Sequence, residues 1–353
     1  VDSQDVEPWL RRQGAIVTIL DEKEKPFGDL IKYDILVRSP GVYRYRPELE
    51  GREVTSKTKI FFDVCPGKII GVTGTKGKGT TSTLIYEILK AAGKKVFLGG
   101  NMGKGVFADL DKMDKESWVV LELSSFQLID LHKSPHIAVA LMVTTEHQDW
   151  HKSPDEYVRA KGSISKFQGS SDYVIYNKDY PNSVKISEQG KGQKIAVSGS
   201  DWQGEMRLRG EHNRENVAAA VAVAKIIGVQ YSVIGEVVKN FKGLEHRLEE
   251  VATVVGVTYF DDSFSTTPET TIAAIRAFRE PLILIVGGSE KGSDFTELGK
   301  VISEAKNIKA VILIGLMAER IEAAITNKDI KLIKGAKNMG EIMELARSVA
   351  KSG

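Results

Sequence analysis

Residues 68–81 read KIIGVTGTKGKGTT, an apolar run followed by a turn rich in glycine, lysine and threonine. The apolar run has the length of a buried strand, and the residues after the turn favour the start of a helix. Glycines in such a turn let backbone N–H groups converge on an anion, and the positive helix terminus adds to the attraction. The stretch therefore predicts a phosphate-binding loop in an α/β fold, in preference to a glycine turn without a ligand.

The loop offers one cation and two hydroxyl groups to a nucleotide. Lys78 can reach the β- and γ-phosphates, while Thr80 or Thr81 can present a hydroxyl to Mg²⁺. Gly79 stands where the common Walker pattern has serine or threonine, so the pattern leaves open which threonine meets the metal. Thr80 is the first candidate. The expected ATP contacts in the loop are Gly74, Thr75, Gly77, Lys78, Gly79, Thr80 and Thr81.

Apolar runs of strand length alternate with amphipathic runs of helix length along the rest of the chain, which is the pattern of an α/β fold. Strands are predicted at 15–20, 34–38, 68–73, 118–123, 137–143, 172–176, 282–286 and 310–314, and helices at 80–92, 213–227, 268–279 and 338–350. Pro66, Gly67 and Gly243 interrupt the periodicity near two expected joints. We therefore expect three domains, at residues 1–65, 66–244 and 245–353.

The composition is that of an ordinary globular protein with little net charge. Its 49 basic and 47 acidic residues give a net charge of +2 over 353 residues, which does not favour a nucleic acid or a membrane surface as partner. The sequence contains neither an apolar run long enough to span a membrane nor a secretory signal. Its single cysteine, Cys65, suits a reducing cytoplasm and is interpreted as a small apolar side chain rather than a nucleophile.

Polar motifs follow the loop at strand ends and helix starts. They are ELSSFQL at 122–128, TTEHQDWH at 144–151, YVRAK at 157–161, GEHNREN at 210–216, GLEHR at 243–247 and DDS at 261–263. A carboxylate at a strand end, as at Glu122, suits Mg²⁺, which prefers oxygen ligands. Taken singly, Glu122 could be a buried acid paired with a lysine, and His147 a structural histidine. Lys161 could be a solvated helix lysine and Asn213 a helix cap.

Together these motifs resemble those of the Mur ligase family, and ELSSFQL resembles its glutamate-adding members. The phosphate loop is also similar to that of folylpolyglutamate synthases, which are relatives of this family. The resemblance extends over residues 15–295 with the motifs in the family's order. It implies a three-domain α/β architecture: a partial Rossmann-like N-terminal domain, a central P-loop ATPase domain with a mostly parallel sheet, and a partial Rossmann-like C-terminal domain.

The resemblance implies bound ATP and two Mg²⁺ sites. The catalytic residues would be Lys78, Glu122, His147 and Lys161, and the metal ligands Thr80, Glu122, His147 and Lys161. Lys161 would act as a carbamate that bridges the metals, which requires a neutral amine that burial or nearby cations would favour. Asn213 and Asn216 would hold the adenine. Arg247 and Asp262 would close over ATP from the third domain.

The resemblance also implies contacts to a UDP-muramoyl substrate and to glutamate. The turns Ser39-Pro40-Gly41 and Gly100-Asn101-Met102-Gly103 resemble elements that contact the muramoyl substrate, and Asp21 takes the place of a uridine contact. The expected substrate-binding residues are Asp21, Ser39, Gly41, Asn101, Ser124, Gln127, His246 and Lys291. Phe264 stands where the family has a lysine that orients D-glutamate, so the stereochemistry of the amino acid stays open.

The implied activity is that of an ATP-dependent acid–amino-acid ligase. It would add glutamate to UDP-N-acetylmuramoyl-L-alanine through an acyl phosphate, as a cytoplasmic monomer in peptidoglycan precursor synthesis. Alternatives are an L-glutamate-adding or folylpolyglutamate-type ligase, and a non-catalytic nucleotide-binding fragment. A P-loop kinase or transport ATPase is a further alternative, although neither explains ELSSFQL.

Both ends of the chain look trimmed relative to this family. The first domain lacks the expected opening strand and glycine turn, and the third stops before a segment that bears serine and phenylalanine. From this pattern we expect a chain that binds Mg-ATP but ligates glutamate poorly.

Overall fold

The computed structural model describes residues 5–21, 27–101, 105–144, 150–290 and 292–350. The chain divides into two compact units, which are described separately. Residues 1–205 and 212–240 form the first unit, and residues 206–211 and 241–353 form the second. The three domain ranges expected from the sequence remain predictions.

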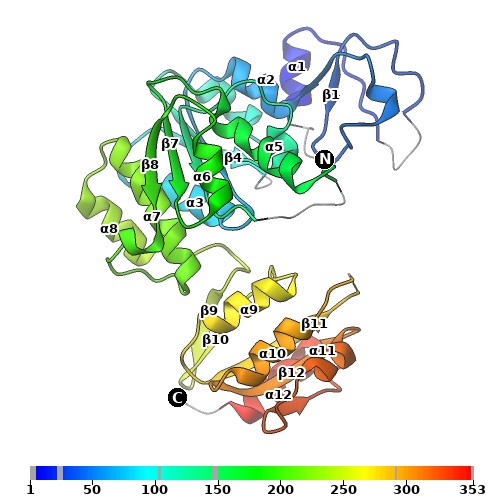
Figure 1. Ribbon diagram of the computed structural model, residues 1–353, viewed down its shortest axis with the longest axis vertical. Helices are drawn as coiled ribbons and strands as arrows, with labels where there is room; N and C mark the ends of the chain where they lie inside the picture. The colour runs from blue at the N-terminus through cyan, green and yellow to red at the C-terminus, as the bar shows by residue number, and fades with distance from the viewer. Residues whose placement is uncertain (1–4, 22–26, 102–104, 145–149, 291, 351–353) are drawn as a thin grey trace. The chain divides into compact units, whose positions relative to one another are not determined.

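The first unit is built on a parallel sheet of six strands in the order β4-β5-β3-β6-β7-β8 (Figure 1). The strands are β3 (Lys68–Thr73), β4 (Val96–Gly100), β5 (Trp118–Glu122), β6 (Ile137–Ala140), β7 (Tyr173–Asn177) and β8 (Gln193–Val197). The chain leaves β3 toward β4 and leaves β6 toward β7, so the strand order reverses between β3 and β6. The prediction of an α/β fold with a mostly parallel central sheet is confirmed.

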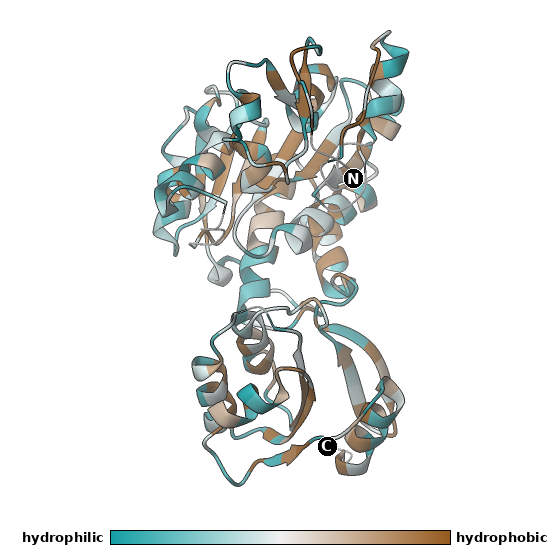
Figure 2. Ribbon diagram, turned by 90° about the vertical axis from the view of Figure 1, so that its right-hand side faces the viewer, coloured by the Kyte–Doolittle hydropathy of each residue, from teal (hydrophilic) through white to brown (hydrophobic). Residues whose placement is uncertain are grey.

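Burial on both faces explains why the central strands could be found in the sequence. Ile70 and Val72 in β3 are fully buried, as are Val119 and Val120 in β5. Strands covered on both faces read as continuous apolar runs rather than as alternating ones. Figure 2 shows these strands as hydrophobic segments flanked by helices of mixed hydropathy.

Helices pack against the sheet and against one another. They are α2 (Lys57–Val64), α3 (Lys78–Ala91), α4 (Ser125–Leu128), α5 (Pro154–Lys166), α6 (Pro181–Ser187), α7 (Glu211–Ile226) and α8 (Tyr231–Asn240). Helix α3 contacts α8, while α5 contacts both α4 and α6. The expected helices at 80–92 and 213–227 correspond to α3 and α7, each of which begins two residues earlier. Within the described residues, no helix is both long and apolar enough to cross a membrane.

The N-terminal segment contains less regular structure than expected. It has α1 (Val6–Arg12), η1 (Pro47–Leu49) and a parallel pair of short strands, β1 (Leu36–Arg38) and β2 (Val54–Ser56). The predicted strand at 15–20 is wrong, since no described segment pairs with it and Ile16 is 97% exposed. An apolar run of strand length forms a strand only where a neighbouring strand supplies ladder hydrogen bonds.

The second unit has its own sheet and its own core. Strands β11 (Leu282–Gly288), β12 (Ile308–Gly315) and β13 (Lys331–Ile333) are parallel, and β9 (Glu249–Val254) pairs antiparallel with β10 (Val257–Asp261). The helices are α9 (Pro268–Arg276), α10 (Thr296–Glu304), α11 (Ala318–Ala324) and α12 (Met339–Val349). Leu298, Ile302, Val311 and Ile321 belong to its hydrophobic core.

We expect Ile70→Ala to reduce the free energy of unfolding of the first unit by about 2–5 kcal/mol, because it leaves a cavity in the fully buried centre of β3. Urea unfolding followed by tryptophan fluorescence measures this unit alone, since all four tryptophans (Trp9, Trp118, Trp150 and Trp202) lie in it. Ile16→Ala is the control and should change the value by less than about 0.5 kcal/mol. Equal losses of unfolding free energy in the two variants would contradict the conclusion that Ile70 lies in the core and Ile16 does not.

Candidate active site

Functional candidates of the first unit gather at the carboxyl edge of the six-stranded sheet. The phosphate loop follows β3, Glu122 ends β5, and residues 141–144 follow β6. Because these parallel strands run in one direction, their carboxyl ends meet, and ligands of open α/β sheets bind there where the strand order reverses. The order reverses between β3 and β6, beside the phosphate loop.

The phosphate loop is folded tightly around its lysine. Gly77 precedes α3 with φ +86°, a conformation that favours glycine. A Cβ at Gly77 would lie 2.2 Å from Asn216 Oδ1, so only glycine fits between the loop and α7. Lys78 Nζ donates to the carbonyl oxygens of Gly74 (3.1 Å) and Thr75 (3.2 Å). The loop therefore places an ammonium group and a helix N-terminus together, as phosphate binding requires.

Thr75, an expected ATP contact, also anchors the loop to the rest of the sheet edge. Its backbone N–H donates to Met142 O (2.7 Å), and its hydroxyl accepts from Thr144 N (3.0 Å). The same hydroxyl lies 3.1 Å from the Tyr157 hydroxyl on α5. In the sequence, Tyr157 was noted only as the first residue of the motif at 157–161. These contacts join the loop to the segment that follows β6 and to α5.

The two asparagines expected at the adenine lie directly behind the loop. Asn213 and Asn216 are buried in the first turns of α7, and Asn216 Nδ2 donates to Asn213 Oδ1 (3.0 Å). Thr81 donates its hydroxyl to Asn216 Oδ1 (3.3 Å). Since Glu211 begins α7, Asn213 lies inside the helix and is not its N-cap. Thr81 is fully buried and engaged, whereas Thr80 is half-buried, which favours Thr80 as the metal-binding hydroxyl.

Glu122 and Asn101 lie side by side at the ends of β5 and β4. Asn101 donates its side-chain amide to Glu122 Oε1 (3.2 Å) and its backbone N–H to Glu122 O (2.9 Å). Glu122 is 8% exposed, and within the described residues this amide, not a lysine, contacts its carboxylate. An oxygen ligand buried this way suits Mg²⁺. The structure thus joins an expected metal ligand to an expected substrate contact.

Lys161 is not a solvated helix lysine. It is 2% exposed and extends from α5 to the phosphate loop, where Nζ donates to Gly74 O (2.9 Å) and Thr73 Oγ1 (3.4 Å). Its ammonium also lies 4.7 Å from the centre of the Tyr157 ring. A carbamate keeps one N–H on Nζ, so a carbamylated Lys161 would retain one of these two donations, and its carboxylate oxygens would be available to a metal ion.

The segment ELSSFQL forms the short helix α4 and its cap. Ser124 accepts from Gln127 N (3.3 Å), and Gln127 Oε1 accepts from Ser124 N (2.9 Å), so both expected substrate contacts also close a capping box. Ser125 Oγ lies 2.9 Å from His151 Nε2, and both side chains are buried. His151 had no separate role in the sequence prediction, because its partner is 26 residues away.

The structure describes some of the remaining candidate residues of the first unit and leaves others outside the described ranges. The turn of Ser39 and Gly41 contacts α4 through Arg38, which donates to Phe126 O (3.3 Å). Asp21 is exposed at the end of the irregular segment that was expected to be a strand. His147 and, in the second unit, Lys291 lie outside the described residues, so their expected metal and substrate contacts stay predictions.

His246 lies in a hydrogen-bonded turn of the second unit. It has φ +62°; its N–H donates to Glu249 Oε2 (2.8 Å), and its Nδ1 lies 2.6 Å from Asp261 Oδ2. The hydrogen bond to Asp261 raises the pKa of His246 above its ordinary value. One ligand atom from each of these three residues could meet at a metal ion, since the atoms lie within 4.8 Å of one another, but hydrogen bonds already explain the grouping.

Arg247 and Asp262 flank the same turn. Asp262 accepts from Leu248 N (3.0 Å) and from the Ser265 hydroxyl (2.5 Å), and burial raises the pKa of its carboxyl group. The guanidinium carbon of Arg247 lies 5.0 Å from the centre of the Phe264 ring. Phe264 therefore contacts the turn, although it is 57% exposed.

Comparisons with known proteins match both units. The model of the Mur ligase middle domain matches residues 72–200, and that of the Mur ligase glutamate ligase domain matches residues 246–353. The UDP-N-acetylmuramoylalanine–D-glutamate ligase of Symbiobacterium thermophilum is 36% identical, over 92% of this chain and 78% of the relative. The enzyme of that name from Acetivibrio thermocellus is 37% identical, over 86% of this chain and 71% of the relative.

Solved structures share the fold at lower identity. MurF of Thermotoga maritima in complex with ADP has a TM-score of 0.65 and 19% identity, over 84% of this chain and 77% of that one. The UDP-N-acetylmuramate–alanine ligase MurC of Thermotoga maritima has a TM-score of 0.61 and 17% identity, over 98% of this chain and 84% of that one. FolC of E. coli has a TM-score of 0.61 and 15% identity, over 84% and 86%.

We expect Gly77→Ala to raise the Kd for ATP by about tenfold or more, because the added Cβ is strained at positive φ and collides with Asn216. Isothermal titration measures the affinity. Gly93→Ala is the matched control, since Gly93 also has positive φ (+71°) but open space around a Cβ. An unchanged ATP affinity in Gly77→Ala would remove the loop from the nucleotide site.

Asp261→Asn should lower the pKa of His246 toward 6.5, as measured by NMR titration of the imidazole protons. Because the folded pKa is raised, the stabilisation by this pair is complete below the unfolded pKa of about 6.5 and is lost as the pH rises through the folded value. Asp294→Asn, at a carboxylate elsewhere in the second unit that accepts from Thr296, is the control and should leave the pKa of His246 unchanged. An unchanged pKa of His246 in the Asp261→Asn variant would refute the pairing of His246 with Asp261.

Proposed function

The chain belongs to the Mur ligase family, and we propose that it is the ATP-dependent ligase that adds D-glutamate to UDP-N-acetylmuramoyl-L-alanine in peptidoglycan precursor synthesis. The observation that carries the proposal is the grouping of the Lys78 loop, Glu122 and Lys161 at one edge of the sheet. The names of the curated relatives supply the substrates. We also infer a cytoplasmic monomer; the single cysteine is in keeping with that compartment.

The first step of the reaction brings together two anions, the substrate carboxylate and the triphosphate of ATP. The alanyl carboxylate of the muramoyl substrate attacks the γ-phosphate of ATP, which yields an acyl phosphate and ADP. The amino group of glutamate then attacks the acyl carbon and displaces phosphate, and the amine loses its proton as the amide forms. Charge repulsion between carboxylate and triphosphate is the main barrier, so a site for this reaction must supply positive charge at fixed positions.

The residues of the first unit fit that demand. The N-terminus of α3 and Lys78 would bind the β- and γ-phosphates. Thr80 and Glu122 would hold Mg²⁺, which when bound neutralises charge between the phosphates and the attacking carboxylate. Asn213 and Asn216, behind the loop, would contact the adenine. The buried Glu122 carboxylate, held by an amide, has the donor chemistry that such a cation prefers.

Lys161 would serve as a further metal ligand after reaction of its amine with CO₂. Burial on α5 supports this role, because it keeps the amine away from bulk water and beside the loop. His147 would bind the second Mg²⁺. Arg247 and Asp262 would contribute to the ATP site, while His246 and Lys291 would contact the incoming amino acid. Asp21, Ser39, Gly41, Asn101, Ser124 and Gln127 would bind the muramoyl substrate.

Product analysis tests the proposed reaction. The chain, incubated with Mg-ATP, UDP-N-acetylmuramoyl-L-alanine and either D- or L-glutamate, should form ADP, phosphate and an amide product that contains one D-glutamate. Lys78→Ala is the inactive control, because it removes the loop's contact to the β- and γ-phosphates. Product with L-glutamate alone would favour the L-adding alternative that Phe264 leaves open. A phosphorylated product that forms without glutamate and resists hydroxylamine would favour a kinase, because hydroxylamine cleaves the acyl phosphate of the ligase reaction.

We expect Lys161→Ala to lose ligase activity and to regain part of it with formate or acetate, which can place a carboxylate in the vacated space. The unaltered chain in ¹³C-bicarbonate should show a carbamate carbon signal that is absent from the variant. Lys166→Ala, on the exposed end of the same helix, is the control and should behave like the unaltered chain. A free amine at saturating bicarbonate would overturn the carbamate assignment.

A further inference from the structure

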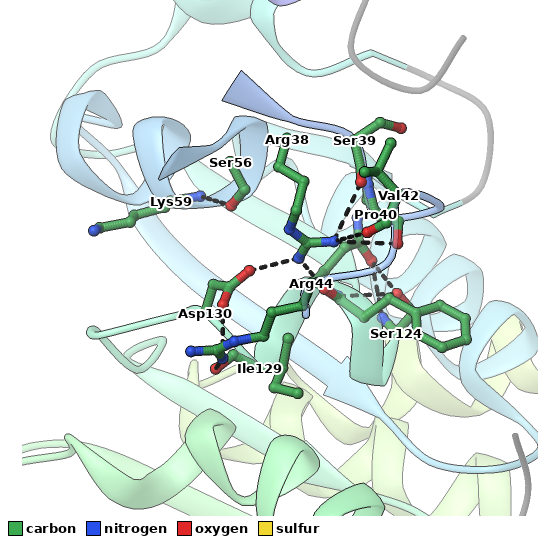
Figure 3. Close-up of polar contacts among 12 residues, drawn as sticks. Arg38, Ser39, Pro40, Val42, Arg44, Ser56, Lys59, Ser124, Ile129 and Asp130 are labelled. Carbon is green, nitrogen blue, oxygen red and sulfur yellow. Dashed lines mark hydrogen bonds and ion pairs between the residues drawn. The ribbon is translucent and has the colours of Figure 1, made fainter. Parts of the chain in front are cut away.

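One carboxylate holds both ends of the turn that carries Ser39 and Gly41. Arg38, the last residue of β1, donates from a terminal nitrogen to Asp130 Oδ2 (2.5 Å), and a terminal nitrogen of Arg44 lies 2.7 Å from Asp130 Oδ1 (Figure 3). The two arginines use different oxygens, so neither displaces the other. Asp130 lies two residues beyond α4, the helix of the ELSSFQL motif.

Arg38 also fixes the path of the turn itself. One terminal nitrogen donates to the carbonyl oxygens of Ser39 (3.3 Å), Pro40 (3.4 Å) and Val42 (2.6 Å). The other terminal nitrogen donates to Phe126 O in α4 (3.3 Å). The side chain is 2% exposed. A planar guanidinium can serve acceptors on two sides at once, which a lysine ammonium cannot reproduce in the same geometry.

We propose that Arg38 and Asp130 are positioning residues for the muramoyl substrate, because they lock the Ser39–Gly41 turn to α4 in one geometry. The inference rests on the proposed function, in which that turn and α4 contact the same ligand. The motifs that resemble the family include the turn and α4 but neither of the residues that join them. A charged pair at this junction, with its arginine buried and its carboxylate half-buried, fixes where two substrate-binding elements lie relative to each other.

A separate contact keeps the segment attached if this junction is weakened. The Tyr45 hydroxyl donates to Glu156 Oε1 in the first turn of α5, and Lys152 N donates to Glu156 Oε2 (2.8 Å). The ring of Tyr45 also lies under the Lys152 ammonium, 3.5 Å from the ring centre. The effect of removing the Asp130 charge should therefore be confined to the turn, and the fold of the unit should remain.

The test uses the chain with Arg38→Lys and, as a milder second variant, Asp130→Asn, which keeps the shape of the side chain. Amide hydrogen exchange of residues 41–45 should become faster in both variants, while exchange of residues 74–81 stays the same. Isothermal titration should show a Kd for UDP-N-acetylmuramoyl-L-alanine that is higher by about tenfold, and a Kd for ATP changed by less than about twofold. Arg46→Lys is the matched control, since its ion pair with Glu48 is more exposed and lies outside the turn.

The outcomes separate the inference from the function on which it rests. Unchanged exchange of residues 41–45, or faster exchange with unchanged affinity for the muramoyl nucleotide, would overturn the positioning role alone. Equal losses of affinity for ATP and for the muramoyl nucleotide would also overturn it, since they would indicate a general structural effect. Failure of the unaltered chain to bind the muramoyl nucleotide would overturn the proposed function and, with it, this inference.

Discussion

The parallel direction of the six strands is the constraint on which the first unit depends. Because every strand ends at the same edge, segments far apart in the sequence are brought together there without a loop having to cross the sheet. The loop after β3, Glu122 at the end of β5 and Thr144 after β6 meet in this way. Helix α5 then returns along the sheet and inserts Lys161 beside the loop. A site with these members could not form at the edge of an antiparallel sheet of the same strands.

The parts of the fold that were predictable are those where burial leaves a local pattern. The central strands were found because both of their faces are covered and their sequences are continuously apolar. Strand β4 ends in Gly99 and Gly100 and was missed, since glycine weakens a strand pattern. Strand β9 was missed because its residues are mostly exposed, whereas the strand expected before Asp262 and Ser263 corresponds to β10. The segment 15–20 was overpredicted for the opposite reason, since its apolar residues have no described strand to pair with.

In the candidate site, as in the fold, the sequence predicted residues that form contiguous motifs but not contacts between residues far apart in the chain. The phosphate loop and ELSSFQL are contiguous motifs, so their residues could be named from the sequence. Contacts that hold the motifs together join residues far apart in the chain, as Thr75 does with Tyr157 and Arg38 with Asp130. No local pattern marks such pairs, because each partner alone looks like an ordinary polar residue. The role of Asn213 is a further example, since only the helix boundary at Glu211 separates a capping residue from one inside the helix.

Because the two units have separate hydrophobic cores, one free energy of unfolding does not describe the whole chain. The clusters around Val119 and Leu123 in the first unit and around Ile302 and Val311 in the second share no residue. Cooperative melting is a property of a shared core, so the two units can melt at different temperatures and a single midpoint would average two transitions. The muramoyl nucleotide, whose proposed contacts all lie in the first unit, would raise only that unit's transition, by mass action. Calorimetric traces of such a chain would then separate into two peaks as the nucleotide concentration increases.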